Sequence, residues 1–323
     1  MQKESKNIVV IYTGSDWDME VPISYEQTRK AFERWHMMAL EKNIQMYRAS
    51  VEWYDIEKNV FIRAWAFRDG KWRRIEKDIT PDLIYDKTPG SSEHKLFDLK
   101  MAMASNSIVF NSPLFRTMVD SKLSQYALFS EYMPKTVVAM NSADLKNAIE
   151  EIKTSKIVAK PLQGSGGFGI VIGDKETILK EKFIYPMLLQ EFVKNENGIP
   201  GFSEKGELAD LRITYINHQP LYALSRIAQG GSLFTNMHQG ATSKRVPLEK
   251  IPPSVWEVTE KIVVKLKMFA KAQYSLDFFF DEKGKPFFIE MNTVPGLCLI
   301  EDLKDPELQQ KDFDAFVEML PRN

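Results

Sequence analysis

The sequence predicts an α/β (α+β) protein of two or three domains, and three observations support this prediction. The chain has 323 residues, which is too many for one ordinary hydrophobic core. Its first third alternates β-branched runs with a helical segment, a pattern typical of an open α/β layer. Its last third contains two aromatic-rich runs on either side of a polar turn, which indicates a β-hairpin.

The first third begins with a β-branched run at residues 8–12, which predicts a buried strand. Residues 26–42 have helical character. Runs rich in β-branched and aromatic residues then predict further strands, and the polar sequence at 68–71 predicts a hairpin turn between two of them. These strands are expected at residues 45–54, 60–67, 71–76, 81–87 and 108–112.

The pattern changes from about Pro113. Helices are expected at residues 118–132 and 142–152, and Ser254-Val-Trp-Glu257 predicts a capping box at the start of a third helix. A glycine-rich loop at 163–169 lies between two predicted strands, and a polar loop is expected at 229–244. The remaining strands are expected at residues 135–140, 156–160, 170–172, 187–193, 210–216 and 221–228.

The composition limits the function classes. The formal net charge is −1, so nothing indicates a nucleic-acid-binding surface. Cys298 is the only cysteine, which excludes a disulfide within the chain and favours a reducing compartment. There is no signal-peptide pattern and no apolar run near the ~20 residues of a membrane span. We therefore expect a cytoplasmic protein with no membrane partner.

The predicted hairpin carries the most informative residues. Folding it about Lys283-Gly284 places Asp277 opposite Glu290, with Asn292 two residues further on the same face. The other face would be apolar, with Leu276, Phe278, Phe280, Phe287, Ile289 and Met291. Two facing carboxylates repel each other unless a cation such as Mg²⁺ lies between them. Acidic residues on a hairpin more often serve solubility, so this metal prediction depends on the rest of the chain.

The glycine-rich loop predicts a phosphate-covering flap. Gly164, Ser165, Gly166 and Gly167 belong to a G-x-G-x-x-G match, but a strand-like run follows it, where a dinucleotide fold needs a helix. It also lacks the ending of a P-loop. A strand–loop–strand hairpin whose backbone amides cover phosphates fits this pattern, and a long turn is the alternative.

Other polar residues interrupt apolar strands or end them. Lys160 ends the strand before the glycine loop, and Lys122 lies on an upstream helix; each could reach a phosphate. Arg212 and Arg226 suit bidentate binding of a carboxylate or phosphate. A second group lies at strand ends and in the polar loop, where a purine or a substrate could be contacted: Gln190, Glu191, Phe192, Val193, Asn236 and His238.

Taken in order, these residues resemble the ATP-grasp superfamily, and within it the glutathione synthetase and ribosomal-protein glutamate-ligase branch. The resemblance covers about residues 113–296. It implies three domains, at residues 1–112, 113–186 and 187–323, with ATP between the central and C-terminal ones.

The resemblance also implies roles for single residues. Lys122 and Lys160 would bind phosphates beneath the 164–169 flap, and Glu191 and Val193 would line the adenine site through their backbone. Arg226 would stabilise the transferred phosphoryl group, and Arg212 would act there or at the acceptor. Two Mg²⁺ ions, with Mn²⁺ as an alternative, would be held by Asp277, Glu290 and Asn292.

The implied reaction is ligation of a carboxylate to an amine through an acyl phosphate, with release of ADP and phosphate. A phosphotransferase and a non-catalytic nucleotide-binding regulator are the alternatives. The chain departs from the branch at Gly240-Ala241, where relatives commonly have two glycines, and at Lys87, where they often carry an arginine. Lys87, Asn236, His238 and Gly240 are the expected substrate contacts, and a homodimer is possible.

Overall fold

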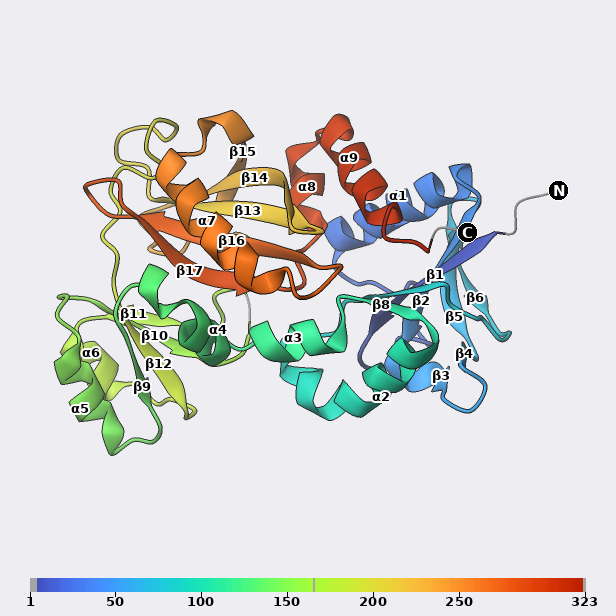
Figure 1. Cartoon of the computed structure of the whole chain (residues 1–323), viewed down its shortest axis with the longest axis horizontal. Helices are drawn as coiled ribbons and strands as arrows, with labels where there is room; N and C mark the ends of the chain where they lie inside the picture. Colours follow the sequence, from blue (N-terminus) through green and yellow to red (C-terminus); the bar gives the residue numbers. More distant parts are fainter. Residues whose placement is uncertain (1–4, 165, 322–323) are drawn as a thin grey trace. The chain divides into compact units, whose positions relative to one another are not determined.

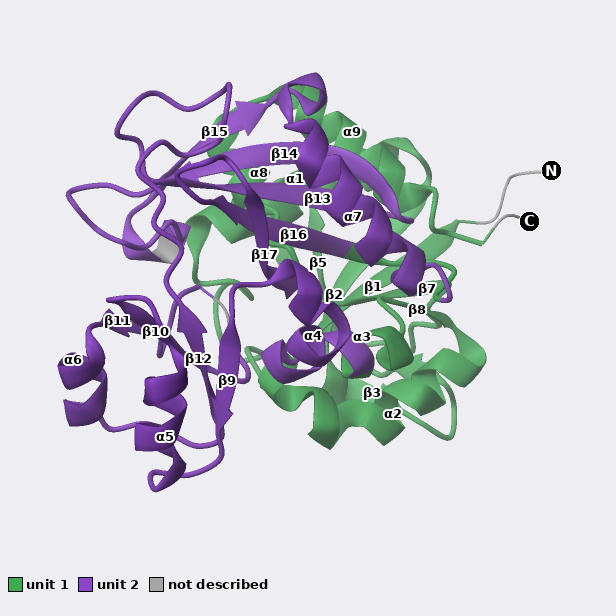
Figure 2. Cartoon of the chain, turned by 60° about the vertical axis from the view of Figure 1, so that its left-hand side comes forward, with its two compact units in different colours: residues 1–117, 269–273, 294–323 green, residues 118–268, 274–293 purple. Residues whose placement is uncertain are grey.

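The computed structural model describes residues 5–164 and 166–321, which form two compact units (Figure 2). Unit 1 takes in residues 1–117, 269–273 and 294–323. Unit 2 takes in residues 118–268 and 274–293. The chain therefore leaves unit 1 twice and returns to it twice. None of the described helices combines the length and apolar character needed to span a membrane.

Unit 1 contains a six-stranded sheet in the order β6-β5-β2-β1-β7-β8 (Figure 1). Strands β2, β1, β7 and β8 are parallel, and β5 and β6 form an antiparallel hairpin at one edge. A separate two-stranded ladder joins β3 and β4. The strands are β1 (Lys6–Tyr12), β2 (Ile44–Ser50), β3 (Tyr54–Asp55), β4 (Val60–Phe61), β5 (Ala64–Arg68), β6 (Lys71–Ile75), β7 (Leu83–Asp86) and β8 (Ile108–Phe110).

The helices of this unit come from both ends of the chain. They are α1 (Glu26–Glu41), α2 (Glu93–Asn106), α8 (Cys298–Leu303) and α9 (Pro306–Val317), with short 3-10 turns η1 (Val51–Trp53) and η2 (Gly90–Ser92). Helix α3 (Pro113–Val119) leads into unit 2. The predicted strand at 8–12 and helix at 26–42 are confirmed by β1 and α1, whereas α2 was not predicted.

Unit 2 contains two antiparallel sheets. The first has the order β11-β10-β12-β9, and α5 and α6 contribute Leu145, Ile149 and Ile178 to the apolar core beside it. Its elements are α4 (Lys122–Phe129), η3 (Ser130–Tyr132), β9 (Thr136–Ala139), α5 (Asp144–Glu151), β10 (Ile157–Pro161), β11 (Val171–Gly173), α6 (Lys175–Lys180) and β12 (Met187–Glu191).

The second sheet of unit 2 has the order β15-β14-β13-β16-β17. Helix α7 buries Val255, Ile262 and Leu266 at helical spacing. It begins at Pro253 without a side-chain cap, so the predicted capping box at Ser254 is wrong. The elements are β13 (Ala209–Ile216), β14 (Gln219–Ile227), η4 (Met237–Gln239), β15 (Thr242–Val246), η5 (Leu248–Lys250), α7 (Pro253–Leu266), β16 (Gln273–Phe280) and β17 (Pro286–Asn292).

The domain boundaries expected from the sequence do not follow the sheets. Strand β12 starts at Met187 and pairs with β10 and β9, so a boundary after residue 186 cuts the four-stranded sheet. Residues 294–323 cluster with unit 1, although the sequence assigns them to the C-terminal domain. Sequence pattern alone does not report which strands pair across long separations. The three-domain division stays a prediction.

Candidate active site

A cleft in unit 2 brings together nine of the residues singled out in the sequence. Including the part open to solvent, its empty volume is about 740 Å³, which lies within the range of small-molecule sites. The four-stranded sheet supplies Lys160 and Gln190, and the five-stranded sheet supplies Arg226, Asp277 and Glu290. The remaining lining residues are Val158, Ile170, Ile172, Glu191, Phe192, Val193, Leu208, Asp210, Leu233, Phe234, Thr235, Asn236, Phe279 and Ile289.

The hairpin of β16 and β17 has the predicted pairing at its functional end. Asp277 lies opposite Glu290, and Asn292 lies opposite Ser275. A bulge follows, because Phe278 pairs with Phe288 and leaves Ile289 as the extra residue. The predicted apolar partners Phe287 and Ile289 are therefore wrong: Phe288 is buried in the core, and Ile289 faces the cleft.

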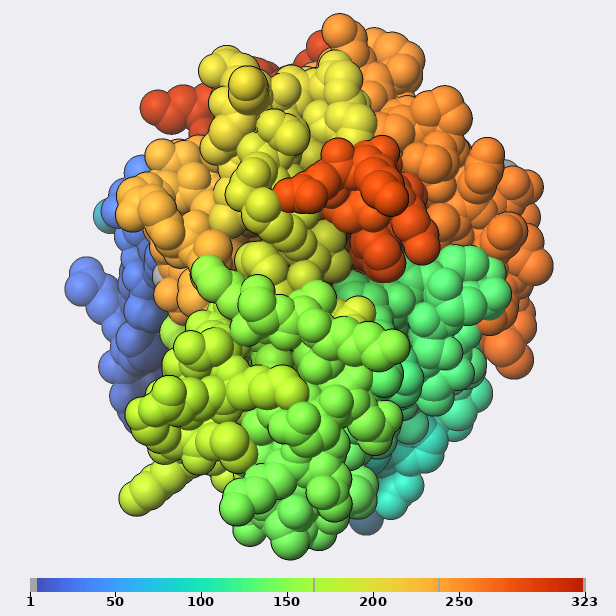
Figure 3. Space-filling view, turned by 90° about the vertical axis from the view of Figure 1, so that its left-hand side faces the viewer, coloured from blue at the N-terminus to red at the C-terminus, as the bar shows by residue number. Residues whose placement is uncertain are grey.

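The turn of this hairpin contacts two other residues of unit 2, Lys194 and Pro200. Lys194 forms an ion pair of 2.7 Å with Glu282. A Cβ added to Gly284 would lie 3.3 Å from the Pro200 side chain, and Gly284 has a φ of +77°, so this position favours glycine. Figure 3 shows the turn, in orange-red, lying against the yellow segment that contains these partners.

Asp277 belongs to a buried chain of alternating charges. Its carboxylate accepts hydrogen bonds from Arg212 Nε at 2.8 Å, from Arg212 Nη2 at 2.6 Å and from Arg226 Nη2 at 2.7 Å. Arg226 also binds Asp210 through Nε at 2.9 Å and through Nη2. Thr235 Oγ1 donates to Asp210 at 2.9 Å, which ties the polar loop to this chain.

The two carboxylates of this chain differ in pKa because they face different numbers of guanidinium groups. Burial works against ionisation of Asp277, but Arg212 and Arg226 together hold its pKa below the ordinary value. Burial dominates at Asp210, which is hydrogen-bonded to Arg226, and its pKa is raised although the charges of Arg226 and Arg212 oppose the rise. Asp277 is thus the more firmly ionised of the two.

Lys160 is held by a relay of neutral hydrogen bonds. Thr136 Oγ1 donates its proton to Pro134 O at 2.9 Å, so its oxygen is left to accept from Gln190 Nε2 at 2.9 Å. The amide oxygen of Gln190 then faces Lys160 and accepts from its Nζ at 2.6 Å. Burial lowers the pKa of Lys160 to about 8, and the charges of Glu290 and Asp277 oppose that fall.

Lys122 connects the glycine-rich loop to the hairpin. Its Nζ donates to the backbone oxygen of Gly164 at 2.7 Å and lies 3.6 Å from Glu290 Oε1. The loop joins β10 to β11, which are antiparallel, so the predicted strand–loop–strand arrangement is confirmed. Ser165 lies outside the described residues.

The loop approaches the opposite wall of the cleft closely. A Cβ on Gly167 would lie 3.0 Å from Asn236 Oδ1, and Gly167 has a φ of +79°. A residue with a side chain would therefore both collide with Asn236 and have an unfavourable backbone conformation. Asn236, predicted as a substrate contact, therefore contacts the flap as well as lining the cleft.

The segment Gln190–Val193 lines the apolar end of the cleft, next to Val158 and Ile172. The backbone N–H of Glu191 donates to Lys135 O at 2.9 Å, and its side chain accepts from Lys153 N at 3.1 Å. The N–H group and the side chain of Glu191 are therefore engaged within unit 2.

Two other predicted substrate contacts, Lys87 and Gly240, do not line this cleft. Lys87 belongs to unit 1, where its Nζ donates to Pro295 O at 2.8 Å and burial lowers its pKa to about 8. Gly240 ends η4 with a φ of +84°. The side chain of His238 lies outside the described part of the chain. The roles of these three residues stay predictions.

Comparison with known proteins identifies this arrangement. Residues 121–277 match the family model described as "Prokaryotic glutathione synthetase, ATP-grasp domain". Nearly the whole chain superposes on D-alanyl-alanine synthetase A from Vibrio cholerae, with a TM-score of 0.65, 13% identity and coverage of 98% and 99% of the two chains. The chain has the ATP-grasp fold. This finding confirms the predicted fold and the predicted resemblance to the superfamily.

Relatives of this ATP-grasp chain include a probable alpha-L-glutamate ligase from Aeromonas salmonicida, 27% identical over 206 residues, which covers 61% of the chain and 63% of the relative. Glutathione synthetase from Escherichia coli K12 is 29% identical over 213 residues, covering 63% and 60%. The chain spans about three fifths of the length of these curated relatives. A RiPP-associated ATP-grasp ligase from Chryseobacterium gregarium superposes with a TM-score of 0.57 at 16% identity over 98% of both chains.

The residues of this ATP-grasp cleft fit a divalent cation. Asp277 accepts three hydrogen bonds, and a carboxylate offers about four acceptor positions. One position on Asp277 therefore remains. The partly exposed Glu290 lies opposite Asp277, and Asn292 lies two residues further along β17. In residues 5–164 and 166–321 no cluster of three His, Cys, Asp or Glu side chains could hold a metal, so the amide oxygen is needed as a third protein ligand.

Sequence reasoning missed two kinds of site residue. The apolar walls at Leu208, Leu233 and Phe279 look like ordinary core positions in the sequence. Asp210 and Thr235 lie close to Arg212 and Asn236 in the sequence but were not themselves predicted as site residues. The pairing of Asp210 with Arg226 across β13 and β14 is what makes Asp210 part of the site. The signal for it in the sequence was the spacing of Asp210 and Arg212, which places both charges on one face of β13.

Proposed function

We propose that this protein is an ATP-dependent carboxylate–amine ligase that forms an amide bond through an acyl phosphate. One observation carries the proposal: a single cleft is lined both by apolar side chains, among them Val158, Ile172, Phe192 and Val193, and by the charged side chains of Lys160, Arg226, Asp277 and Glu290. The apolar side chains suit a purine ring, and the charged ones suit a metal-bound triphosphate. The ligase names of the relatives support this reading.

The apolar and the charged lining of the cleft assign roles to the remaining residues. Lys122 and Lys160 would bind phosphate oxygens, and the backbone of residues 164, 166 and 167 would cover them. Asp277, Glu290 and Asn292 would hold Mg²⁺, two ions in our proposal, with Mn²⁺ as a substitute. When bound, the metal supplies a positive charge that draws electron density from the phosphate oxygens.

The chemistry needs no protein nucleophile. A substrate carboxylate oxygen attacks the γ-phosphorus, the bond to the bridging oxygen breaks, and ADP leaves. The amine then attacks the acyl carbon, phosphate leaves, and the amine nitrogen loses a proton. Arg226, held by Asp210 and Asp277, presents a fixed positive charge to the phosphoryl group and needs little reorganisation. The flap keeps water from the acyl phosphate.

The substrates are proposed only by chemical class, as a carboxylate and an amine that belong to amino acids or peptides. The names glutathione synthetase and alpha-L-glutamate ligase support this class. Asn236, which lines the cleft beside the flap, is the best-placed of the four predicted substrate contacts.

Product analysis tests the proposal. The protein is incubated with ATP, Mg²⁺ and pools of amino acids and dipeptides, and ADP, free phosphate and new amides are measured. A ligase releases ADP and phosphate in equal amounts only when both an acid and an amine are present. ADP without free phosphate would instead indicate a phosphotransferase, and no turnover with any pool would favour a non-catalytic nucleotide-binding protein.

Substituting Gly167 by Ala should lower kcat by about tenfold or more, because the methyl group collides with Asn236 and disfavours the positive φ. The closed flap would be lost while the fold persists. Gly206→Ala is a matched control, since Gly206 also has a positive φ but a Cβ there would meet no atom within 4 Å. Equal losses of kcat in the two variants would contradict the flap assignment.

Substituting Thr136 by Val should raise the KM for ATP by about three- to tenfold, the effect of losing one hydrogen bond. Valine cannot accept from Gln190, so the Gln190 amide can turn its NH₂ group toward Lys160. Lys160 binds phosphate only while protonated, so ATP binding in the wild type should weaken above pH of about 8.

The Thr136→Val variant should show this weakening at a lower pH, and Thr136→Ser should restore the wild-type profile. If the KM for ATP rises but the pH at which ATP binding weakens stays that of the wild type, Thr136 contributes only by packing.

A further inference from the structure

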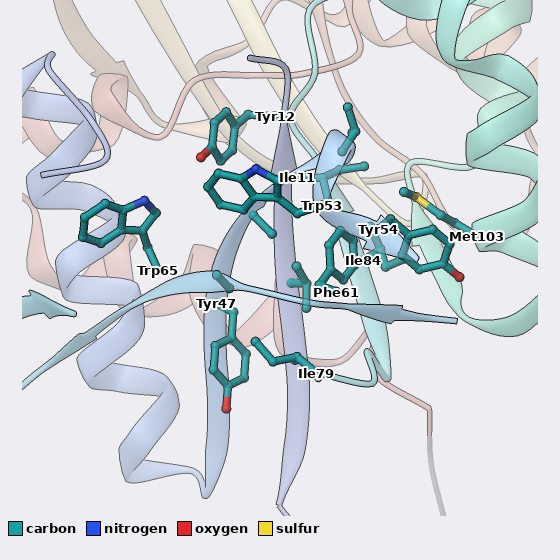
Figure 4. Packing of buried hydrophobic residues seen from close by; sticks show 14 of the residues in the cluster. Ile11, Tyr12, Tyr47, Trp53, Tyr54, Phe61, Trp65, Ile79, Ile84 and Met103 are labelled. Carbon is teal, nitrogen blue, oxygen red and sulfur yellow. The ribbon is translucent and has the colours of Figure 1, made fainter. Parts of the chain in front are cut away.

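A cluster of aromatic rings and arginines in unit 1 has no part in the proposed reaction. It lies where the parallel strands β1 and β2 end, the edge at which open α/β sheets bind ligands. Tyr12, the last residue of β1, hydrogen-bonds through its hydroxyl to Asp16. The guanidinium of Arg48 stacks on the Tyr12 ring at 3.4 Å. Figure 4 shows Tyr12, Trp53 and Trp65 on one side of the buried apolar cluster of this unit.

Asp16 is the carboxylate that this cluster provides, and it is already engaged. It accepts from Tyr12 Oη, from Trp65 Nε1 at 3.0 Å and from Arg48 Nη2 at 3.5 Å. Arg74 is satisfied by two backbone oxygens, those of Trp17 at 2.7 Å and Met19 at 2.8 Å.

Arg63 is different. Its guanidinium lies 4.9 Å from the ring centroids of both Trp17 and Trp53. Its Nε is buried without a hydrogen-bond partner, as is that of Arg48. Among the residues that the structure describes, none places a carboxylate in ion-pair distance of Arg63. A buried donor without an acceptor is costly, so the missing acceptor points to a ligand.

Arg48 and Arg63 both lie near the hydroxyl group of Tyr12. Burial and the Asp16 hydrogen bond raise the pKa of Tyr12, and the positive charges of Arg48 and Arg63 both oppose that rise. Both guanidiniums therefore lie within electrostatic range of the same hydroxyl. Arg63 and Trp17 are only half-buried, so this place can be reached from solvent.

We propose that Arg63, with Arg48 beside it, forms a binding site for the carboxylate group of an amino acid or peptide. Trp17 and Trp53, whose rings are nearly perpendicular at 77°, both lie 4.9 Å from the Arg63 guanidinium. The guanidinium is a planar fork of donors, and a planar carboxylate can pair with it through two parallel hydrogen bonds. A tetrahedral phosphate would project out of this plane toward the rings. The site belongs to unit 1 alone and does not depend on the proposed ligase reaction.

Tryptophan fluorescence of the whole chain, in buffer without ATP, tests this site. The probes are N-acetylglycine for a main-chain carboxylate, N-acetylglutamate α-amide for a side-chain carboxylate, and inorganic phosphate. Saturable quenching is expected with one or both of the carboxylate probes. The probe that binds more tightly shows whether the natural ligand offers a main-chain or a side-chain carboxylate. Arg63→Gln should weaken it by about tenfold or more, because a charge-assisted bidentate pair is lost.

Arg63→Lys should weaken carboxylate binding as well, since a lysine keeps the charge but has no planar fork. The matched control is Arg73→Gln on the adjacent strand β6, where Arg73 is exposed and paired with Asp69. Circular dichroism checks that each variant folds; if Arg63→Gln does not, the wild-type titration and Arg63→Lys decide. The proposal is overturned if neither carboxylate gives saturable quenching, if phosphate binds more tightly, or if Arg73→Gln loses as much affinity as the Arg63 variants.

Discussion

Substituting Glu290 by Gln should lower kcat by at least about 10³-fold, while the melting temperature stays close to that of the wild type. An amide of the same shape keeps the packing but removes the charge that the proposed metal site needs. The stability cost is small because Glu290 is partly exposed, and its ion-pair contact with Lys122 is long, at 3.6 Å. Steady-state release of ADP and phosphate as a function of Mg²⁺ concentration measures the effect.

Glu282→Gln provides the matched control for this substitution. Glu282 lies in the turn of the same hairpin, is exposed and pairs with Lys194, so it tests any general effect of removing a negative charge there. Wild-type turnover is expected for Glu282→Gln. The metal assignment fails if Glu290→Gln keeps more than about a tenth of the wild-type kcat, or if the control loses as much.

The hairpin shows how far the sequence could define this site. The alternation of Asp277 and Glu290 with apolar neighbours predicted their pairing correctly. The bulge just beyond them could not be predicted, because residues 287, 288 and 289 are all apolar. Any one-residue shift within that run still places an apolar side chain in the core, so the pattern does not determine the register. The structure places Phe288 there and turns Ile289 toward the cleft.

Helix α2 was missed for a different physical reason. Its buried residues are Glu93, Lys100 and Met103, so two of the three are charged. They are paired within unit 1: Lys100 contacts Glu93 and, at 2.7 Å, Asp86, and Arg116 lies 2.8 Å from Asp86. A helix that buries ion pairs lacks the apolar periodicity by which sequence reasoning recognises amphipathic helices. Burial of charge depends on partners that only the folded chain brings together.

Substituting Arg226 by Met should abolish turnover and also destabilise unit 2. Arg226 is the group that pairs with both Asp210 and Asp277. Without it, Asp277 keeps Arg212, whereas Asp210 keeps only the hydroxyl of Thr235. Leaving a buried charge without its partner costs about 3–5 kcal/mol. Urea unfolding of the variant, followed by circular dichroism, measures that loss.

The sign of the pH dependence identifies the cause of this instability. Burial already raises the pKa of Asp210 in the wild type, and loss of Arg226 should raise it further. An acid whose pKa is higher in the folded state binds protons more readily when folded, so the free energy of unfolding should rise as the pH falls toward that pKa. A variant that is destabilised equally at every pH would contradict this account.

A second substitution separates stability from catalysis. Asp210→Asn in the Arg226→Met background removes the uncompensated charge, so much of the lost stability should return and its pH dependence should disappear. Turnover should not return, because the guanidinium that faces the phosphoryl group is still absent. If the double variant regains activity together with stability, Arg226 acts only as a counter-ion for Asp210. If neither returns, the two residues do not form the buried pair on which the proposed role of Arg226 depends.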